Sequence, residues 1–151
     1  MGTTVSHPAE QLAALPWRRR DGVFEVLMVT SRLSGHWLIP KGWPMEGKTA
    51  PEAALQEAWE EAGLRGEASS EPVGSYCYEK LRRDGTTVGC TVSVFAMQVS
   101  EELDDWKECG ARRRQWFDLN EAAQRAYEPG LRALLEKLRA ENVMAATSAA
   151  A

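Results

Sequence analysis

The segment between Thr49 and Gly63 constrains the fold most, because the sequence sets both of its ends. Thr49 is a favoured N-cap residue, and Glu52, three positions later, completes a capping box. Strong helix formers, mainly Ala, Leu, Gln and Glu, fill the following positions, and Gly63 is a typical residue just past a helix end. The sequence therefore predicts a helix over residues 50–62.

Strand-like segments lie on both sides of this helix. The expected strands are 12–17, 23–29, 37–39, 74–81, 88–99 and 115–117. Residues 23–29 are almost continuously apolar, which is typical of a strand covered on both faces. Two more helices are expected, and the second has an apolar stripe at helical spacing. They span 120–127 and 129–141, and the stripe is Leu131, Leu134, Leu135 and Leu138. This order predicts a mixed α+β sandwich rather than a doubly wound sheet.

The chain of 151 residues has the length of one ordinary domain. Its first ten residues are polar and are expected to form a flexible arm. Residues 143–151 are rich in Ala, Ser and Thr and are expected to form a flexible tail. No repeat or interior linker interrupts the remainder. We therefore expect a single domain over residues 11–142.

The net charge of −4 argues against a protein that coats nucleic acid, since such proteins need a basic surface. It leaves room for a local basic pocket, because arginine is clustered at 18–20, 82–83 and 112–114. The other interpretation of each cluster is an ordinary solvated face.

Three cysteines, Cys77, Cys90 and Cys109, form no C-x-x-C pair, so we expect no zinc site. The sequence shows no charged-then-apolar signal pattern and no apolar run of the roughly 18 residues that would span a bilayer. An odd number of cysteines is typical of a reducing compartment. We expect a soluble, cytoplasmic protein that does not bind membranes.

Three carboxylates, those of Glu57, Glu60 and Glu61, fall within an arc of roughly 100° on one face of the predicted helix. The apolar residues gather on the opposite side: Leu55, Ala58, Trp59 and Ala62. The carboxylates repel one another, and the helix dipole disfavours anions near a C-terminus. A cation would offset this cost, and oxygen ligands suit Mg²⁺ or Mn²⁺. A solvated acidic face is the alternative that these residues alone leave open.

Residues 42–64 resemble the Nudix box, G-x5-E-x7-R-E-U-x-E-E-x-G-U, where U is a bulky apolar residue. The matching positions are Gly42, Glu57, Glu60, Glu61, Gly63 and Leu64. Three positions depart from it: Lys48 replaces the first glutamate, Gln56 the arginine, and Ala58 the first U. In the family the missing Glu and Arg are thought to brace the loop against the helix. Lys48 and Gln56 could still form a hydrogen bond.

The resemblance implies a Nudix-type α/β/α sandwich, with a mixed sheet between the Nudix helix and the C-terminal helices. It also implies a hydrolase that cleaves phosphoanhydride bonds. Glu57, Glu61 and the Gly42 carbonyl would ligate Mg²⁺, for which Mn²⁺ could substitute. Glu60 would orient or deprotonate the attacking water. The candidates for an additional metal ligand are Glu79, Glu101 and Glu102.

The resemblance extends over about residues 13–138, and the segments 31–40 and 103–117 are similar to the diphosphoinositol polyphosphate phosphohydrolase and diadenosine polyphosphate hydrolase branch. This implies a small-molecule polyphosphate substrate. The residues implied to bind it are Arg32, Lys41, Trp43, Arg82 and Arg112. Residues 10–12 lack the basic side chains of that branch, and Glu128 stands where a lysine is usual. Fewer cations favour a dinucleoside polyphosphate over the heavily phosphorylated inositol substrate.

Two other functions are compatible with these residues. The loss of two box residues at Lys48 and Gln56 would fit a module that binds nucleotides without cleaving them. The arginine clusters would fit an RNA 5′-end pyrophosphohydrolase, although the net negative charge does not favour it.

Overall fold

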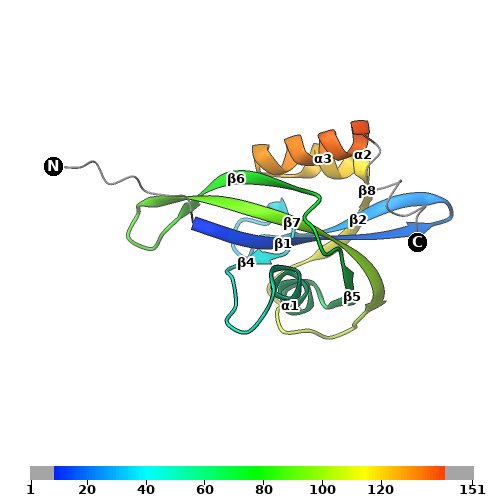
Figure 1. Cartoon of the computed structure of the whole chain (residues 1–151), viewed down its shortest axis with the longest axis horizontal. Helices are drawn as coiled ribbons and strands as arrows, with labels where there is room; N and C mark the ends of the chain where they lie inside the picture. The colour runs from blue at the N-terminus through cyan, green and yellow to red at the C-terminus, as the bar shows by residue number, and fades with distance from the viewer. Residues whose placement is uncertain (1–8, 142–151) are drawn as a thin grey trace.

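The computed structural model describes residues 9–141, in which a mixed β-sheet lies between one helix on one face and two helices on the other (Figure 1). The strands are β1 (Ala9–Arg20), β2 (Val23–Thr30), β3 (Trp37–Leu38), β4 (Lys41–Gly42), β5 (Leu64–Ala68), β6 (Gly74–Leu81), β7 (Thr87–Glu102) and β8 (Arg114–Asp118). The helices are α1 (Ala50–Ala62), α2 (Leu119–Arg125) and α3 (Pro129–Glu141). This is the predicted α/β/α sandwich.

The sheet is mixed because its two long central strands, β1 and β7, run parallel from Ala9 opposite Cys90 to Trp17 opposite Gln98. The other strand pairs are antiparallel. The main path of the sheet is β3-β2-β1-β7-β5, while β4 pairs with β1, β6 with β7 and β8 with β2. The parallel pair at the centre is covered on both faces, as such pairs usually are.

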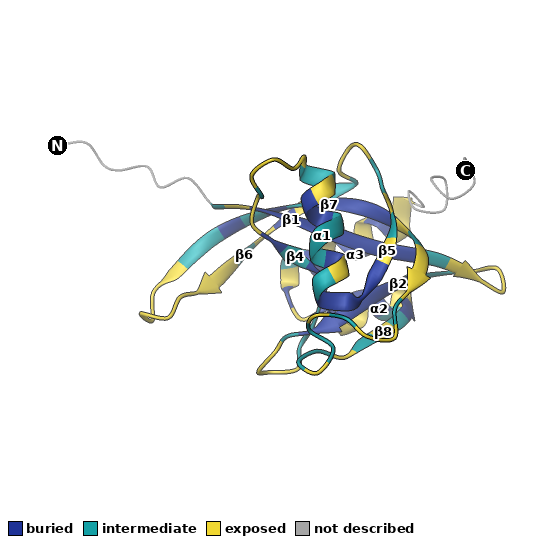
Figure 2. Cartoon of the chain, turned by 90° about the horizontal axis from the view of Figure 1, so that it is seen from below, coloured by how far each residue is buried: buried dark blue, intermediate teal, exposed yellow. Residues whose placement is uncertain are grey.

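Alternate residues of the central strands enter two separate cores. In β1, Ala13 and Leu15 face α2 and α3, whereas Leu12 and Ala14 face α1. Figure 2 accordingly shows the central parts of β1 and β7 as buried, while the turn between β6 and β7 is exposed. The predicted leucine stripe of α3 is buried in the first core. In β2, Val26 and Met28 enter the first core and Leu27 and Val29 the second, so the expectation that the strand at residues 23–29 is covered on both faces is confirmed.

Helix α1 has the predicted limits. The Thr49 hydroxyl accepts a hydrogen bond from the Glu52 backbone N–H, and the Glu52 carboxylate accepts one from the Thr49 N–H. Gly63 ends the helix with φ at 65°, a conformation that glycine adopts without steric cost. The side facing the sheet is made of small residues: Ala53, Ala54, Ala58 and Ala62. Trp59, which we placed on this side, is instead 42% exposed.

Other details differ from the expected elements. Strand β1 already begins at Ala9, and β5 was not predicted because Leu-Arg-Gly-Glu-Ala has no apolar run. Strand β5 is held instead by pairing with β7. Helix α2 begins at Leu119, where the Asp118 side chain caps it. Most of the expected N-terminal arm and the whole C-terminal tail lie outside the described residues. Within residues 9–141, the helices are too short or too polar to cross a bilayer.

Candidate active site

The side chain of Glu57 lies directly against the backbone of Gly42. A Cβ atom added to Gly42 would be 1.5 Å from Oε2 of Glu57, so a residue with a side chain there would displace the carboxylate. Gly42 is held in place because β4 pairs with β1, and α1 packs on the same part of the sheet. The fold therefore brings together two residues of the candidate metal site that are separate in the sequence.

The pKa values of Glu57 and Glu61 are both raised. Burial raises the pKa of Glu57 to about 7, and the charges of Glu60 and Glu108 add to the effect. Burial also raises the pKa of Glu61 to about 8, although the Arg112 guanidinium opposes the shift. Ionising both carboxyl groups therefore costs free energy in the protein alone. A divalent cation held between them would remove that cost, so these groups suit a cation-binding role.

Glu60 has different surroundings, although it lies on the same helix. Its Oε1 accepts a hydrogen bond of 2.7 Å from Nζ of Lys107, and its Oε2 accepts one of 2.9 Å from Nε2 of Gln56. These bonds lower the pKa of Glu60, so this carboxylate stays ionised. Among the described residues, Lys48 and Gln56 form no hydrogen bond with each other, and the Gln56 amide donates to Glu60 within α1.

A fourth carboxylate, that of Glu108, lies near this group. The loop between β7 and β8 turns back over α1, and the backbone N–H of Glu108 donates a 3.1 Å hydrogen bond to the Glu60 carbonyl. The charge of Glu108 also raises the pKa of Glu57 and Glu61. The sequence did not single out Glu108, because it lies in a polar loop without helical or strand periodicity.

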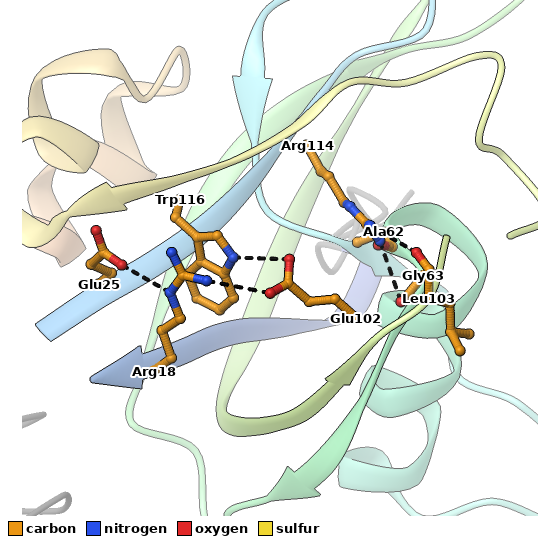
Figure 3. Close-up of polar contacts among 8 residues, drawn as sticks. All are labelled: Arg18, Glu25, Ala62, Gly63, Glu102, Leu103, Arg114 and Trp116. Carbon is orange, nitrogen blue, oxygen red and sulfur yellow. Dashed lines mark hydrogen bonds and ion pairs between the residues drawn. The ribbon is translucent and has the colours of Figure 1, made fainter. Parts of the chain in front are cut away.

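The three acids that we considered as further metal ligands have other contacts. Glu101 forms an ion pair of 3.7 Å with Arg65. Glu102 accepts hydrogen bonds from Trp116 and Arg18. In Figure 3 this group of residues lies apart from the contacts that Arg114 makes at the end of α1. The Glu79 carboxylate lies beside Gly89. Of the four acids, Glu108 is therefore the best candidate for an additional metal ligand, because its charge acts on both Glu57 and Glu61.

Part of the arginine run 112–114 is structural. Nη1 of Arg114 donates to the carbonyl oxygens of Ala62 at 2.8 Å and Gly63 at 3.4 Å, and its Nη2 donates to that of Leu103 at 2.7 Å (Figure 3). The Ala62 and Gly63 carbonyls lie at the C-terminal end of α1, where carbonyls have no partner within the helix, and the Leu103 carbonyl directly follows β7. Arg114 therefore anchors the helix that carries the carboxylates, and this role was not predicted.

The chemistry of the site fits Mg²⁺ or Mn²⁺, since its donors are carboxylate and carbonyl oxygens. In residues 9–141, no three Asp, Glu, His or Cys side chains stand close enough together to hold an ion by themselves. Mg²⁺ usually keeps several waters and takes one or two carboxylates from the protein. The pair formed by Glu57 and Glu61, with the adjoining Gly42 carbonyl, is compatible with that mode of binding.

A cavity of about 480 Å³ opens beside Glu61. Its charged lining residues are Arg32, Lys41, Glu61, Lys80, Arg112 and Glu128. Nη1 of Arg112 donates to the Thr30 carbonyl at 3.0 Å, and its Nη2 lies 4.0 Å from Oε1 of Glu61. The structure thus gathers three of the expected substrate-binding residues, namely Arg32, Lys41 and Arg112, around one cavity.

The other two expected substrate contacts do not line this cavity. Trp43 is 45% exposed, and Arg82 lies in the exposed turn between β6 and β7. A larger cavity of about 510 Å³ lies between α1 and β5, and its lining includes Lys48 and Gln56. Because none of the three helix carboxylates lines that larger cavity, we place the candidate active site at the smaller one.

Comparison with known proteins agrees with this fold. The chain matches the NUDIX domain over residues 10–138, and it therefore belongs to the Nudix family. It is 40% identical to Nudix hydrolase 12, mitochondrial, of Arabidopsis thaliana, over 76% of this chain and 59% of that protein. It is 33% identical to diphosphoinositol polyphosphate phosphohydrolase 3-alpha of Mus musculus, over 76% of this chain and 69% of that protein.

The fold is also similar to that of solved structures. A binary complex of the C. elegans Ap4A hydrolase superposes with a TM-score of 0.68 at 20% identity, covering 89% of this chain and 98% of that one. This likeness shows the fold alone. The aligned part of the chain spans about three fifths of the length of the Arabidopsis relatives.

Proposed function

We propose that this protein is a Mg²⁺-dependent hydrolase that cleaves a phosphoanhydride bond in a dinucleoside polyphosphate. The observation that carries the proposal is the position of Glu57 against Gly42 and beside Glu61, next to a cavity that is lined by several cationic side chains. The named relatives include Nudix hydrolases and a diphosphoinositol polyphosphate phosphohydrolase, which supports a polyphosphate substrate.

In this proposal, Glu57, Glu61 and the Gly42 carbonyl hold Mg²⁺, and Mn²⁺ can substitute. The metal neutralises phosphoryl oxygens and acidifies water when it is bound. Glu60 stays ionised through its contacts with Lys107 and Gln56, so it can accept a proton from the attacking water or orient it. Lys107 lies on the exposed side of this group, where movement of its flexible side chain would release Glu60.

The cationic side chains that line the cavity have a separate role. Arg32 and Arg112 line the cavity and can bind the phosphate groups, whereas Arg82 and Trp43, which do not line it, remain proposed contacts. Placing the phosphates beside the helix carboxylates orients the bond to be cleaved. We also retain a cytoplasmic location as part of the proposal, on the basis of three unpaired cysteines.

A substrate panel tests the function. Purified protein is incubated with Mg²⁺ and, separately, with Ap4A, Ap5A, Ap6A, diphosphoinositol pentakisphosphate, nucleoside triphosphates and 5′-triphosphorylated RNA, and products are separated by chromatography. We expect the highest kcat/KM with a dinucleoside polyphosphate. Binding without cleavage would support the nucleotide-binding module instead, and preferential RNA cleavage would support the RNA 5′-end pyrophosphohydrolase.

The pKa values of Glu57 and Glu61 predict how Mg²⁺ stabilises the protein at different pH. Both values are raised, so the metal-free folded state keeps protons that the unfolded state releases as pH rises above about 4.5. Metal-free stability should therefore fall as pH rises toward 8. Mg²⁺ binds the ionised groups, so at a hundredfold excess over its Kd we expect it to raise Tm by about 5–10 °C near pH 8.5.

Near pH 5.5 we expect a much smaller effect, because protons compete with the metal. The measurement is thermal melting with and without Mg²⁺ at both pH values, with NaCl at equal ionic strength as the control. An equal rise in Tm at both pH values would contradict a site formed by these two carboxylates.

A further inference from the structure

The last turn of α1 carries two of the three carboxylates of the candidate site, those of Glu60 and Glu61. The final carbonyl groups of a helix have no partner within it, and helix ends fray. The carboxylates also repel one another, and the last turn of α1 contains no basic residue that would offset the helix dipole. Holding Glu60 and Glu61 in place therefore requires contacts from outside the helix.

Four successive carbonyl oxygens at the end of α1 accept hydrogen bonds from residues 103–114, the segment that follows β7. The pairs, with the carbonyl first, are Glu60 with the Glu108 N–H, Glu61 with Nε1 of Trp106, Ala62 with Nη1 of Arg114, and Gly63 with the Leu103 N–H and Nη1 of Arg114. Figure 3 shows the part that Arg114 provides. Of these donors, only those of Trp106 and Arg114 belong to side chains, so a substitution can remove them.

Trp106 supports the end of α1 in three ways. Its Nε1 donates a hydrogen bond of 3.1 Å to the Glu61 carbonyl. Its ring lies against Gly63, where an added Cβ atom would be 2.7 Å from Cδ2 of the ring. The guanidinium of Arg114 lies 4.0 Å from the ring centroid, a cation–π contact that places the second side-chain donor. One aromatic side chain thus connects the last turn of α1 to the other residue that binds its carbonyls.

Core packing does not account for Trp106. Among residues 9–141, it belongs to neither hydrophobic core, and it is only partly buried. Its contribution to global stability should therefore be modest, since hydrophobic stabilisation scales with the apolar area that is buried. The next residue, Lys107, donates to Oε1 of Glu60. The position of Trp106 consequently also affects where this segment meets the Glu60 carboxylate.

We propose that Trp106 is a positioning residue that fixes the last turn of α1, so that Glu61 can ligate Mg²⁺ and Glu60 can act on the attacking water. This inference rests on the proposed function and adds to it a residue outside the Nudix box. Trp106 does not line the active-site cavity. Its loss should therefore lower kcat and metal affinity but leave KM, which depends on Arg32 and Arg112, nearly unchanged.

The test compares two substitutions of Trp106. Trp106→Phe keeps an aromatic ring without an N–H donor, whereas Trp106→His is the conservative variant that keeps a ring N–H. At saturating Mg²⁺ and mildly alkaline pH, where histidine is neutral, we expect Trp106→Phe to lower kcat about 30-fold and to change KM by less than about twofold. Trp106→His should recover most of the lost kcat.

The matched control is Trp17→Phe, which makes the same substitution in the core on the other face of the sheet. It should lower Tm and leave kcat unchanged at a temperature where the variant is folded. Melting curves of all three variants establish that temperature. A general effect of lost stability would appear in Trp17→Phe as well, and a positioning effect would not.

Two further measurements do not depend on turnover. Amide hydrogen exchange, followed by NMR without metal, should be about tenfold faster at residues 60–63 in Trp106→Phe and unchanged at residues 54–57, because only the last turn frays. Binding of Mn²⁺, followed by the EPR signal of the free ion, should weaken about tenfold, as is typical when a residue that orients a metal ligand is lost. Trp17→Phe should cause neither change.

Normal kcat in Trp106→Phe, an equal loss in Trp106→His or in Trp17→Phe, or an unfolded Trp106→Phe would overturn the inference. No turnover by the unaltered protein, together with faster exchange and weaker Mn²⁺ binding in Trp106→Phe, would overturn the proposed hydrolase activity and leave Trp106 as a positioning residue of the metal site. Turnover that Trp106→Phe does not affect would overturn the inference alone. Failure of the inference and failure of the proposed function are therefore distinguishable.

Discussion

Glu57→Gln is expected to lower Mg²⁺-dependent turnover about 10³-fold, because a bound metal contributes several kcal/mol to the transition state and each 1.4 kcal/mol is about tenfold in rate. The amide keeps the size of the side chain beside Gly42 but cannot supply an anionic ligand. The measurement is kcat/KM for the best substrate of the panel over a range of Mg²⁺ concentrations.

The fold of this variant should be unaffected or slightly stabilised. Burial raises the pKa of Glu57 to about 7, so ionising this group costs stability in the metal-free protein. Glu71→Gln, at an exposed position outside the site, is the matched control and should keep full turnover. A Glu57→Gln variant with normal turnover and normal Mg²⁺ dependence would refute the assigned metal ligand.

Gly42→Ala should lower turnover about 100-fold while the protein stays folded, since displacements of about 1 Å in an active site can cost that much. The added methyl group would overlap the Glu57 carboxylate at 1.5 Å. That carboxylate is the end of a flexible side chain, so it can swing aside at small cost to stability. We therefore expect a nearly normal Tm without metal and a much smaller rise in Tm with Mg²⁺.

The control for this substitution is Gly89→Ala in β7, where an added Cβ would make an ordinary contact of 3.6 Å with Glu79. It should change neither turnover nor the stabilisation by Mg²⁺. If Gly42→Ala kept both at the level of the unaltered protein, the close packing of Gly42 against Glu57 would have no part in the site.

Several features of the site depend on contacts that a linear sequence does not display. Glu108 and Lys107 lie in a loop without periodicity, and they reach the carboxylates because that loop turns back over α1. Arg112 and Arg114 belong to the same arginine run in the sequence, yet the guanidinium of Arg114 donates hydrogen bonds to carbonyl oxygens at the end of α1. Neighbouring residues of one arginine run point to different partners, and composition cannot separate them.

The sequence by itself determined α1, because its capping box, its helix formers and Gly63 are local signals that act within a few residues. It also determined that the strand at residues 23–29 is covered on both faces and that three carboxylates share one helix. Only the tertiary structure decided what surrounds each carboxylate. Burial raises the pKa of Glu61 and the charge of Arg112 opposes that rise, whereas hydrogen bonds from Lys107 and Gln56 lower the pKa of Glu60.

The tertiary structure also decided that Lys41 is paired with Glu128, although the two residues are far apart in the chain. Charge, burial and hydrogen bonding depend on distance in space, and residues distant in sequence set them. Helix limits depend instead on hydrogen bonds between near neighbours. For this reason the helix that carries the three carboxylates was predictable from the sequence, while the contacts around those carboxylates were not.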